Sequence, residues 1–161
     1  MRSFFLSSLL LLNIVYLFFG CEEEKLTPQQ EDAQYKQEIV DAAPIKFDYE
    51  VIEPSNNLSQ TLKEFSGHWV GRWGERYASQ LIVTEINSKE AKFIYSWEGN
   101  QIRKIEGCAI SEKGKVQPTG RIIYESENES LTFAIDTLLN KVIGVHLIDD
   151  EITNIVMEKY E

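Results

Sequence analysis

The amino-acid sequence predicts an all-β domain of eight short antiparallel strands, arranged as an up-and-down barrel or a sandwich. Short apolar runs recur at nearly even spacing in the second half of the chain, turn-forming residues separate them, and no long helical period competes with this pattern. The expected strands are residues 68–73, 78–86, 91–97, 102–110, 116–124, 131–136, 141–148 and 152–158. The expected turns lie at Asn87-Ser88, Glu98-Gly99-Asn100, Lys113-Gly114, Glu127-Asn128-Glu129, Asn140 and Asp149-Asp150.

The first 20 residues have the composition of a secretory signal. Arg2 is followed by an apolar run over residues 4–19, which is long enough for a signal peptide but marginal for crossing a bilayer. The run ends at Phe18-Phe19-Gly20-Cys21, which resembles the lipobox of bacterial lipoproteins. Phe18 departs from that pattern, because leucine is usual there and Leu17 lies one step earlier.

The lipobox resemblance implies that Cys21 carries lipid on its sulfur and becomes the new amino terminus after cleavage. The protein is then expected in the bacterial cell envelope, held on the inner or outer membrane by its lipid anchor. The alternative is an ordinary signal peptide or a retained anchor. Cys108 is the second cysteine, and we expect it to be a small buried apolar residue; without lipidation, a Cys21–Cys108 disulfide becomes an option.

Three segments follow the signal. Residues 21–44 are acidic and polar, which predicts a flexible tether, transiently helical over 29–40. Residues 45–64 comprise an alternating segment, read as a half-buried strand or an extended arm, and a short helix capped by Ser59 that runs to Phe65. Residues 65–161 form the β domain.

The most distinctive motif is Gly67-His68-Trp69, at the start of the first expected strand. With the short helix before it, it resembles the G-x-W signature of lipocalins and related calycins, which implies a lipocalin-like barrel closed at one end by Trp69. Strand alternation places Trp69 and Trp73 inward, and His68, Val70 and Arg72 toward water. Lys159 stands roughly where the family has a cation on this tryptophan.

The expected interior is aromatic and is formed by Trp69, Trp73, Phe93, Tyr95, Trp97, Tyr124, Phe133 and Val145. Such a lining suits a small apolar ligand, although eight strands can also enclose only their own side chains. We therefore expect a tethered, non-enzymatic barrel that binds a small apolar or amphipathic ligand through Trp69, Trp73, Tyr95 and Trp97. The alternative is a packed structural or adaptor domain that contacts another cell-envelope protein.

Other functions find little support in the sequence. The net charge of −10 becomes −11 when Arg2 is removed, and no cluster of lysine and arginine is present to bind nucleic acid. His68 and His146 do not have metal-ligand spacing, and no nucleophile elbow occurs. Glu98, Glu106 and Asp136 are candidate members of a carboxylate pair, but solvated charge explains them better. No catalytic residue, metal or cofactor is expected.

Overall fold

The computed structural model describes residues 25–99 and 107–160. The expected signal segment, the lipobox with Cys21, and Glu106 lie outside these residues. The helices are α1 (Pro28–Ala42) and α2 (Gln60–Phe65). The strands are β1 (Gly67–Trp73), β2 (Tyr77–Ile86), β3 (Glu90–Trp97), β4 (Cys108–Val116), β5 (Arg121–Glu125), β6 (Glu129–Asp136), β7 (Lys141–Ile148) and β8 (Glu151–Lys159).

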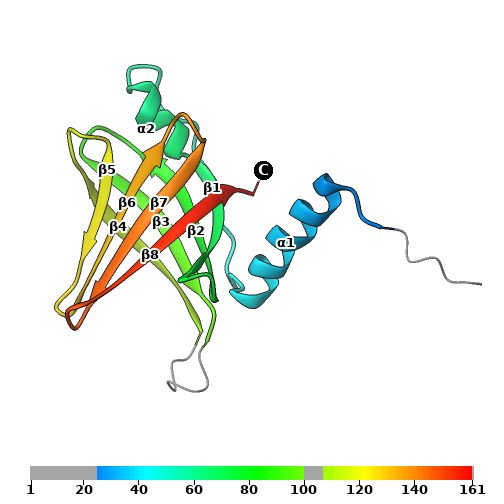
Figure 1. Ribbon diagram of the computed structural model, residues 1–161. Coiled ribbons are helices and arrows are strands. Elements are labelled where there is room, and N and C mark those ends of the chain that lie inside the picture. The colour runs from blue at the N-terminus through cyan, green and yellow to red at the C-terminus, as the bar shows by residue number, and fades with distance from the viewer. Residues whose placement is uncertain (1–24, 100–106, 161) are drawn as a thin grey trace, which may run out of the picture.

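The eight strands form a closed, all-antiparallel, up-and-down barrel, which confirms the predicted fold (Figure 1). Each strand pairs with its neighbours in sequence, and β8 closes the barrel on β1. Trp69 lies opposite Leu81 on one side and Lys159 on the other. This architecture is consistent with a lipocalin-like fold.

The predicted fourth and fifth strands were misplaced. They were expected over 102–110 and 116–124, whereas β4 and β5 begin at Cys108 and Arg121; residues 102–106 of the expected fourth strand lie outside the described residues. Gly114 was taken as part of a turn but lies within β4, where a Cβ would come within 2.6 Å of the Ile122 side chain. The turn lies instead near Gly120, whose φ of +78° favours glycine and whose N–H donates to the carbonyl of Gln117 at 2.9 Å.

The barrel interior is the main hydrophobic core. Trp69, Phe93 and Phe133 are fully buried there, as the strand alternation predicted. Val145 was wrongly placed inward. It pairs with Thr132 and Asn154 on the outer face of the barrel and is exposed, because inward positions on β7 start at Val142 and alternate from there.

Helix α2 seals one end of the barrel. The Ser59 side chain accepts a hydrogen bond from the backbone of Leu62, and Leu62 and Phe65 are buried in the core. The Trp69 indole N–H donates to the carbonyl of Phe65 at 2.8 Å. The Lys159 ammonium lies 5.2 Å from the Trp69 ring centroid, so a lysine provides the cation expected beside this tryptophan.

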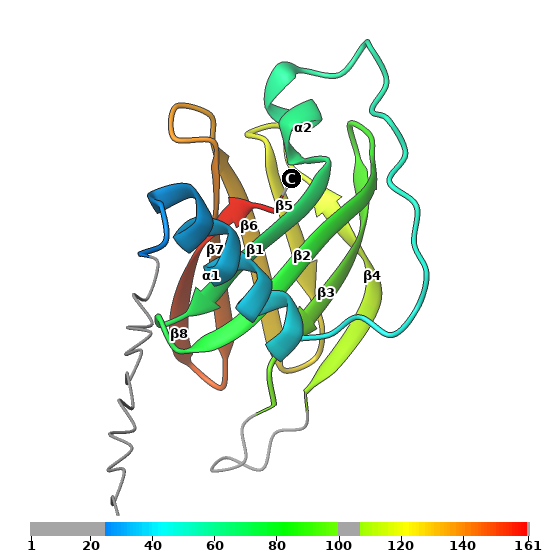
Figure 2. The same ribbon diagram turned by 90° about the vertical axis from the view of Figure 1, so that its right-hand side faces the viewer.

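The segment expected to be a flexible tether is an ordered helix from Pro28 onward. A capping box at Thr27 starts α1, and Ile39 and Ala43 at its carboxyl end are fully buried against the outer face of β1 and β2 (Figure 2). Val70, expected to face water, is buried beneath this helix. The docking of α1 on the barrel could not be predicted from the sequence, because the apolar residues that make the contact lie near the carboxyl end of an otherwise mostly polar helix.

Residues 44–58 then run along the outside of the barrel toward α2 (Figure 2). The Ser96 hydroxyl donates to the carbonyl of Ala43 at 2.7 Å, and the Ile52 N–H donates to the carbonyl of Thr84 at the same distance. These bonds hold the extended arm on β2 and β3. Neither helix in the described ranges is long and apolar enough to cross a membrane.

Candidate ligand-binding site

The two ends of the barrel differ. Helix α2 covers one end, whereas the other, here called the distal end, is formed by turns that include residues 74–76, 126–128 and 149–150. Several inward-facing residues near the distal end remain partly exposed, among them Trp97, Glu129 and His146.

A buried hydrogen-bond cluster lies in the distal half of the interior. The Trp73 indole N–H is 2.5 Å from the Tyr95 hydroxyl and 3.2 Å from Ser79 Oγ. Ser79 Oγ is also 3.1 Å from the Tyr95 hydroxyl and 3.0 Å from the Ser96 carbonyl. Burial raises the pKa of Tyr95 to about 12, so its hydroxyl stays neutral at physiological pH.

Aromatic rings extend this cluster toward the distal end. Tyr95 stacks on Trp97 with ring centroids 5.6 Å apart, and Trp73 lies 5.6 Å from the ring of His146. His146 Nε2 is 3.0 Å from Glu129 Oε2, which orients the imidazole. The result is an aromatic cluster in which Trp73 and Tyr95 are buried, Trp97 and His146 are partly exposed, and polar groups are held at fixed positions.

The charge of the distal interior is negative among the described strand residues. Glu112 pairs with Phe93 on the inward face of β4, and Glu129 enters from β6. The pKa of Tyr124 is raised by burial and then by these two carboxylates. The inward positions of the described strands provide no arginine, and their one lysine, Lys159, lies at the opposite end beside Trp69.

Three of the four predicted ligand residues come together. Trp73, Tyr95 and Trp97 belong to the distal cluster, whereas Trp69 lies four residues earlier on β1, about 13 Å along the strand. Trp69 therefore belongs to the sealed end.

Sequence reasoning missed Ser79, Glu129 and His146 as members of the site. From the sequence, His146 was considered only as a metal ligand, which its spacing did not support. The alternation through 142, 144 and 146 on β7 carried the signal that its ring faces inward. Glu129 had been placed in a turn, whereas it is the first residue of β6.

Other candidate residues serve structural roles or stand apart. Glu98 accepts a hydrogen bond from the Ala78 backbone at the distal end, whereas Asp136 caps a turn at the α2 end, so the two carboxylates do not meet. Cys108 is an exposed free thiol, not the buried residue expected, because it is the first residue of β4. In the described ranges, no three histidine, cysteine or carboxylate side chains are grouped to hold a metal ion.

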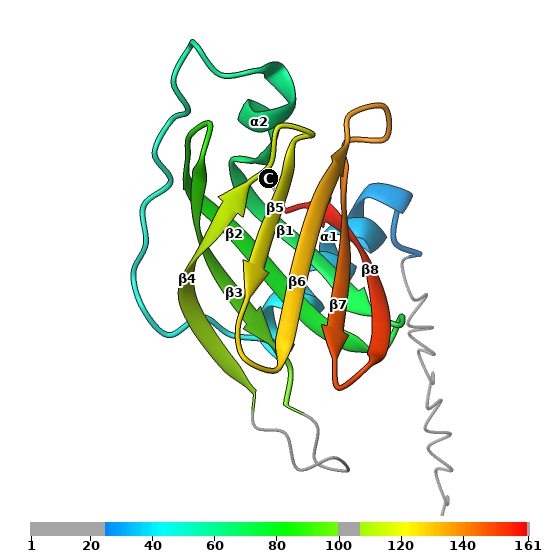
Figure 3. The same ribbon diagram turned by 90° about the vertical axis from the view of Figure 1, so that its left-hand side faces the viewer.

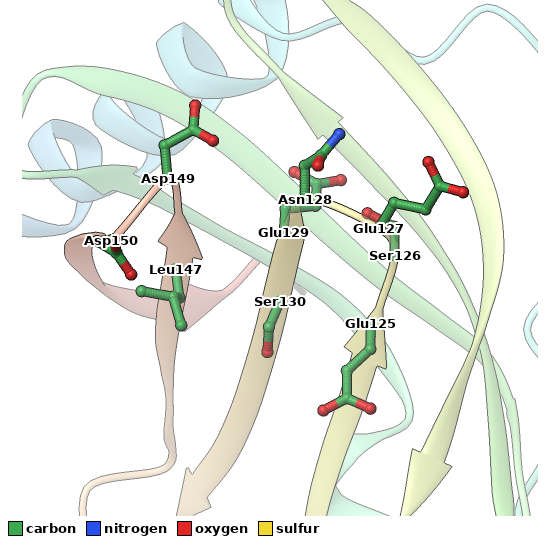
Figure 4. Close-up of a pocket in the computed structure, with 9 residues that line it drawn as sticks. All are labelled: Glu125, Ser126, Glu127, Asn128, Glu129, Ser130, Leu147, Asp149 and Asp150. Atoms are coloured by element: carbon green, nitrogen blue, oxygen red, sulfur yellow. The ribbon is translucent and has the colours of Figure 1, made fainter.

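Two clefts lie on the outer surface. One, of about 500 Å³, is lined by the turns of the β5–β6 and β7–β8 hairpins (Figure 4). The other, of about 870 Å³, lies between Tyr35 of α1 and the outer face of β8 and β1. Neither is lined by Trp69, Trp73, Tyr95 or Trp97.

No family model, no curated protein and no solved structure matches this chain.

Proposed function

We propose that the distal half of the barrel binds a small amphipathic molecule that has a neutral or cationic head group. The observation that carries this proposal is the aromatic cluster of Trp73, Tyr95 and Trp97, in which Trp97 is partly exposed and the other two rings are buried and fixed by hydrogen bonds. Rigid aromatic faces provide apolar contact area, and a few oriented polar groups select the ligand.

The head-group preference follows from the charges at the distal end. Glu129 faces inward there, Glu112 faces inward from the middle of β4, and in the described ranges no lysine or arginine faces inward beside them. A carboxylate in a partly desolvated site that already holds two carboxylates is repelled, whereas an amine or alcohol is not. The ligand is thus expected to enter with its apolar body against the rings and its head near the glutamates.

The test uses the full chain in lipid nanodiscs, incubated with decylamine, decanol or decanoate at equal concentration. Native mass spectrometry should detect one bound decylamine or decanol, with decanoate weaker by about tenfold, equivalent to about 1.4 kcal/mol. Trp97→Leu should weaken binding, whereas Leu138→Ala, at an exposed position in the β6–β7 turn, should not. Absence of all three adducts would refute the site, and preferred decanoate binding would refute the head-group preference.

We further propose that the protein is a bacterial lipoprotein anchored to a cell-envelope membrane through Cys21. Two or more acyl chains hold a protein stably on a bilayer. Because α1 begins at Pro28, six residues, 22–27, separate the lipidated cysteine from this helix. The fully extended reach from Cys21 to Pro28 is about 25 Å, so the amino end of α1 would lie within that distance of the membrane surface.

The chain contains a matched control for the anchor. Cys21→Ala should abolish labelling with an alkyne fatty acid and release the protein from the membrane fraction. Cys108→Ala removes the other cysteine and should leave both properties unchanged. Equal labelling of the two variants would refute lipidation at Cys21.

A further inference from the structure

An exposed apolar surface lies on the outside of the barrel over β7 and β8. We name it the β7–β8 face and define it by Ile143, Val145, Leu147, Ile152 and Val156, which are 42%, 36%, 40%, 68% and 53% exposed. The register brings Ile143 opposite Val156, and Leu147 opposite Ile152, with the uncharged Asn154 opposite Val145 between them, so the five apolar side chains border one surface. No helix of the described ranges covers the outer side of β6 and β7 (Figure 3).

The neighbouring outer positions on β6 keep this surface flat and uncharged. Ala134, Thr132 and Ser130 lie opposite Ile143, Val145 and Leu147. A solvated outer sheet face is normally polar, and contiguous exposed apolar patches mark interaction sites. On the outer face of β1 and β2, by contrast, the apolar residues Val70 and Ala78 are buried by α1.

The distal end of the β7–β8 face continues into the acidic cleft of about 500 Å³, and Leu147 lines both (Figure 4). Five carboxylate residues and no lysine or arginine line this cleft: Glu125, Glu127, Glu129, Asp149 and Asp150. At the other end of the face, Lys141 is already paired with Glu158 at 2.7 Å. The surface is therefore apolar in its centre and strongly acidic at one end.

We infer that the β7–β8 face binds a protein segment that has apolar residues followed by lysine or arginine. Its apolar side chains would cover Val145, Leu147 and Ile152, and its cations would enter the acidic cleft. A second copy of this chain is a poorer fit, because its β7–β8 face offers one lysine that is already paired. An anionic membrane is repelled by the five carboxylates. The inference shares only Glu129 with the ligand site inside the barrel and does not rest on ligand binding there.

The test places the photo-crosslinking amino acid benzoyl-phenylalanine at Ile152 of the full chain in its native membrane. The control places it at Leu138, which is 95% exposed and lies outside the face. Mass spectrometry of the adducts should identify, at position 152 only, a protein segment in which apolar residues adjoin lysine or arginine. Asp149→Asn with Asp150→Asn keeps a residue type that tolerates their positive φ and removes two charges. This double variant should lower the adduct yield about fivefold, as expected for the loss of exposed ion pairs.

Four results would overturn the inference. They are no adduct at position 152, an adduct with lipid, an adduct with another copy of this chain, and an adduct with a segment that lacks basic residues. An adduct yield unaffected by the two Asp→Asn changes would also contradict it. None of these results depends on decylamine binding, so failure here is distinguishable from failure of the proposed ligand site.

Discussion

Removing the hydroxyl of Tyr95 tests the polar base of the candidate site. Tyr95→Phe keeps the ring and its stacking on Trp97 but removes the oxygen 2.5 Å from the Trp73 indole nitrogen. Ser79 Oγ, at 3.2 Å from that nitrogen, remains as an acceptor, so the indole is not left entirely unpaired. A net buried hydrogen bond contributes about 1 kcal/mol, and an unsatisfied buried group costs about 1–3 kcal/mol. We expect a loss of about 1–2 kcal/mol in the free energy of unfolding.

Urea unfolding followed by far-ultraviolet circular dichroism measures this loss. With a slope of about 2 kcal/mol per molar urea, the midpoint should fall by about 0.5–1 M. Tyr124→Phe is the matched control, because the Tyr124 hydroxyl forms no hydrogen bond with a described residue, and it should change stability by less than about 0.5 kcal/mol. If Tyr95→Phe were no more destabilising than Tyr124→Phe, the hydrogen-bond cluster would have no part in fixing the rings.

Three further predictions concern alkaline stability, closure of the barrel and docking of α1. Tyr95 has a folded-state pKa of about 12, above its unfolded value, so its neutral form stabilises the fold below pH 10 and that contribution is lost as pH rises toward 12. The loss totals about 2.7 kcal/mol, should appear in unfolding titrations between these pH values, and should be smaller in Tyr95→Phe. Gly71→Ala places a Cβ 2.4 Å from the Val156 carbonyl oxygen, whereas Gly144→Ala meets side-chain atoms only, Ile155 Cγ2 at 2.6 Å and the Phe133 ring at 3.0 Å. Thermal unfolding should show a loss of about 3 kcal/mol for the first and about 2 kcal/mol for the second, because buried side chains can shift more than the backbone of the β1–β8 ladder, and the reverse order would contradict the β1–β8 closure. Ile39→Asp buries a charge at the α1 interface and should make α1 sensitive to protease while the barrel stays folded. Glu38→Asp, at an exposed position of the same helix, is the control. Equal protection of α1 from protease in the two variants would count against docking of α1 on the barrel.

The sequence allowed the barrel to be predicted because its strands alternate and its turns carry strong local signals. The strand predicted over residues 141–148 matches β7, because it is rich in β-branched residues and turn residues stand at both of its ends, Asn140 before it and Asp149-Asp150 after it. The fourth and fifth strands were misplaced because Gly114 was taken for a turn residue. In the structure it lies within β4 and leaves room for the Ile122 side chain, a contact that the sequence does not reveal. A glycine alone therefore did not locate the turn between β4 and β5.

The candidate site could be predicted only in part, for a similar reason. Alternation identified Trp73, Tyr95 and Trp97 as inward-facing, but it did not show that α2 covers the end of the barrel where Trp69 lies. The docking of α1 depends on Gln80, whose amide donates to the carbonyls of Val40 and Ala43. Such contacts join segments about 40 residues apart, and no local pattern encodes them.

Site-resolved tryptophan quenching tests the central claim most directly. The chain has three tryptophans, so pairs of Trp→Phe changes leave Trp69, Trp73 or Trp97 as the single emitter in the full chain in nanodiscs. As a control, Leu138→Trp in a chain whose three native tryptophans are all replaced by phenylalanine measures quenching at a position outside the barrel. With decylamine brominated on its chain as the probe, quenching of Trp73 and Trp97 well above that of residue 138, with Trp69 unaffected, is the predicted result. Quenching of Trp69 as strong as that of Trp97, or none beyond the residue 138 control, would contradict a ligand site at the distal end.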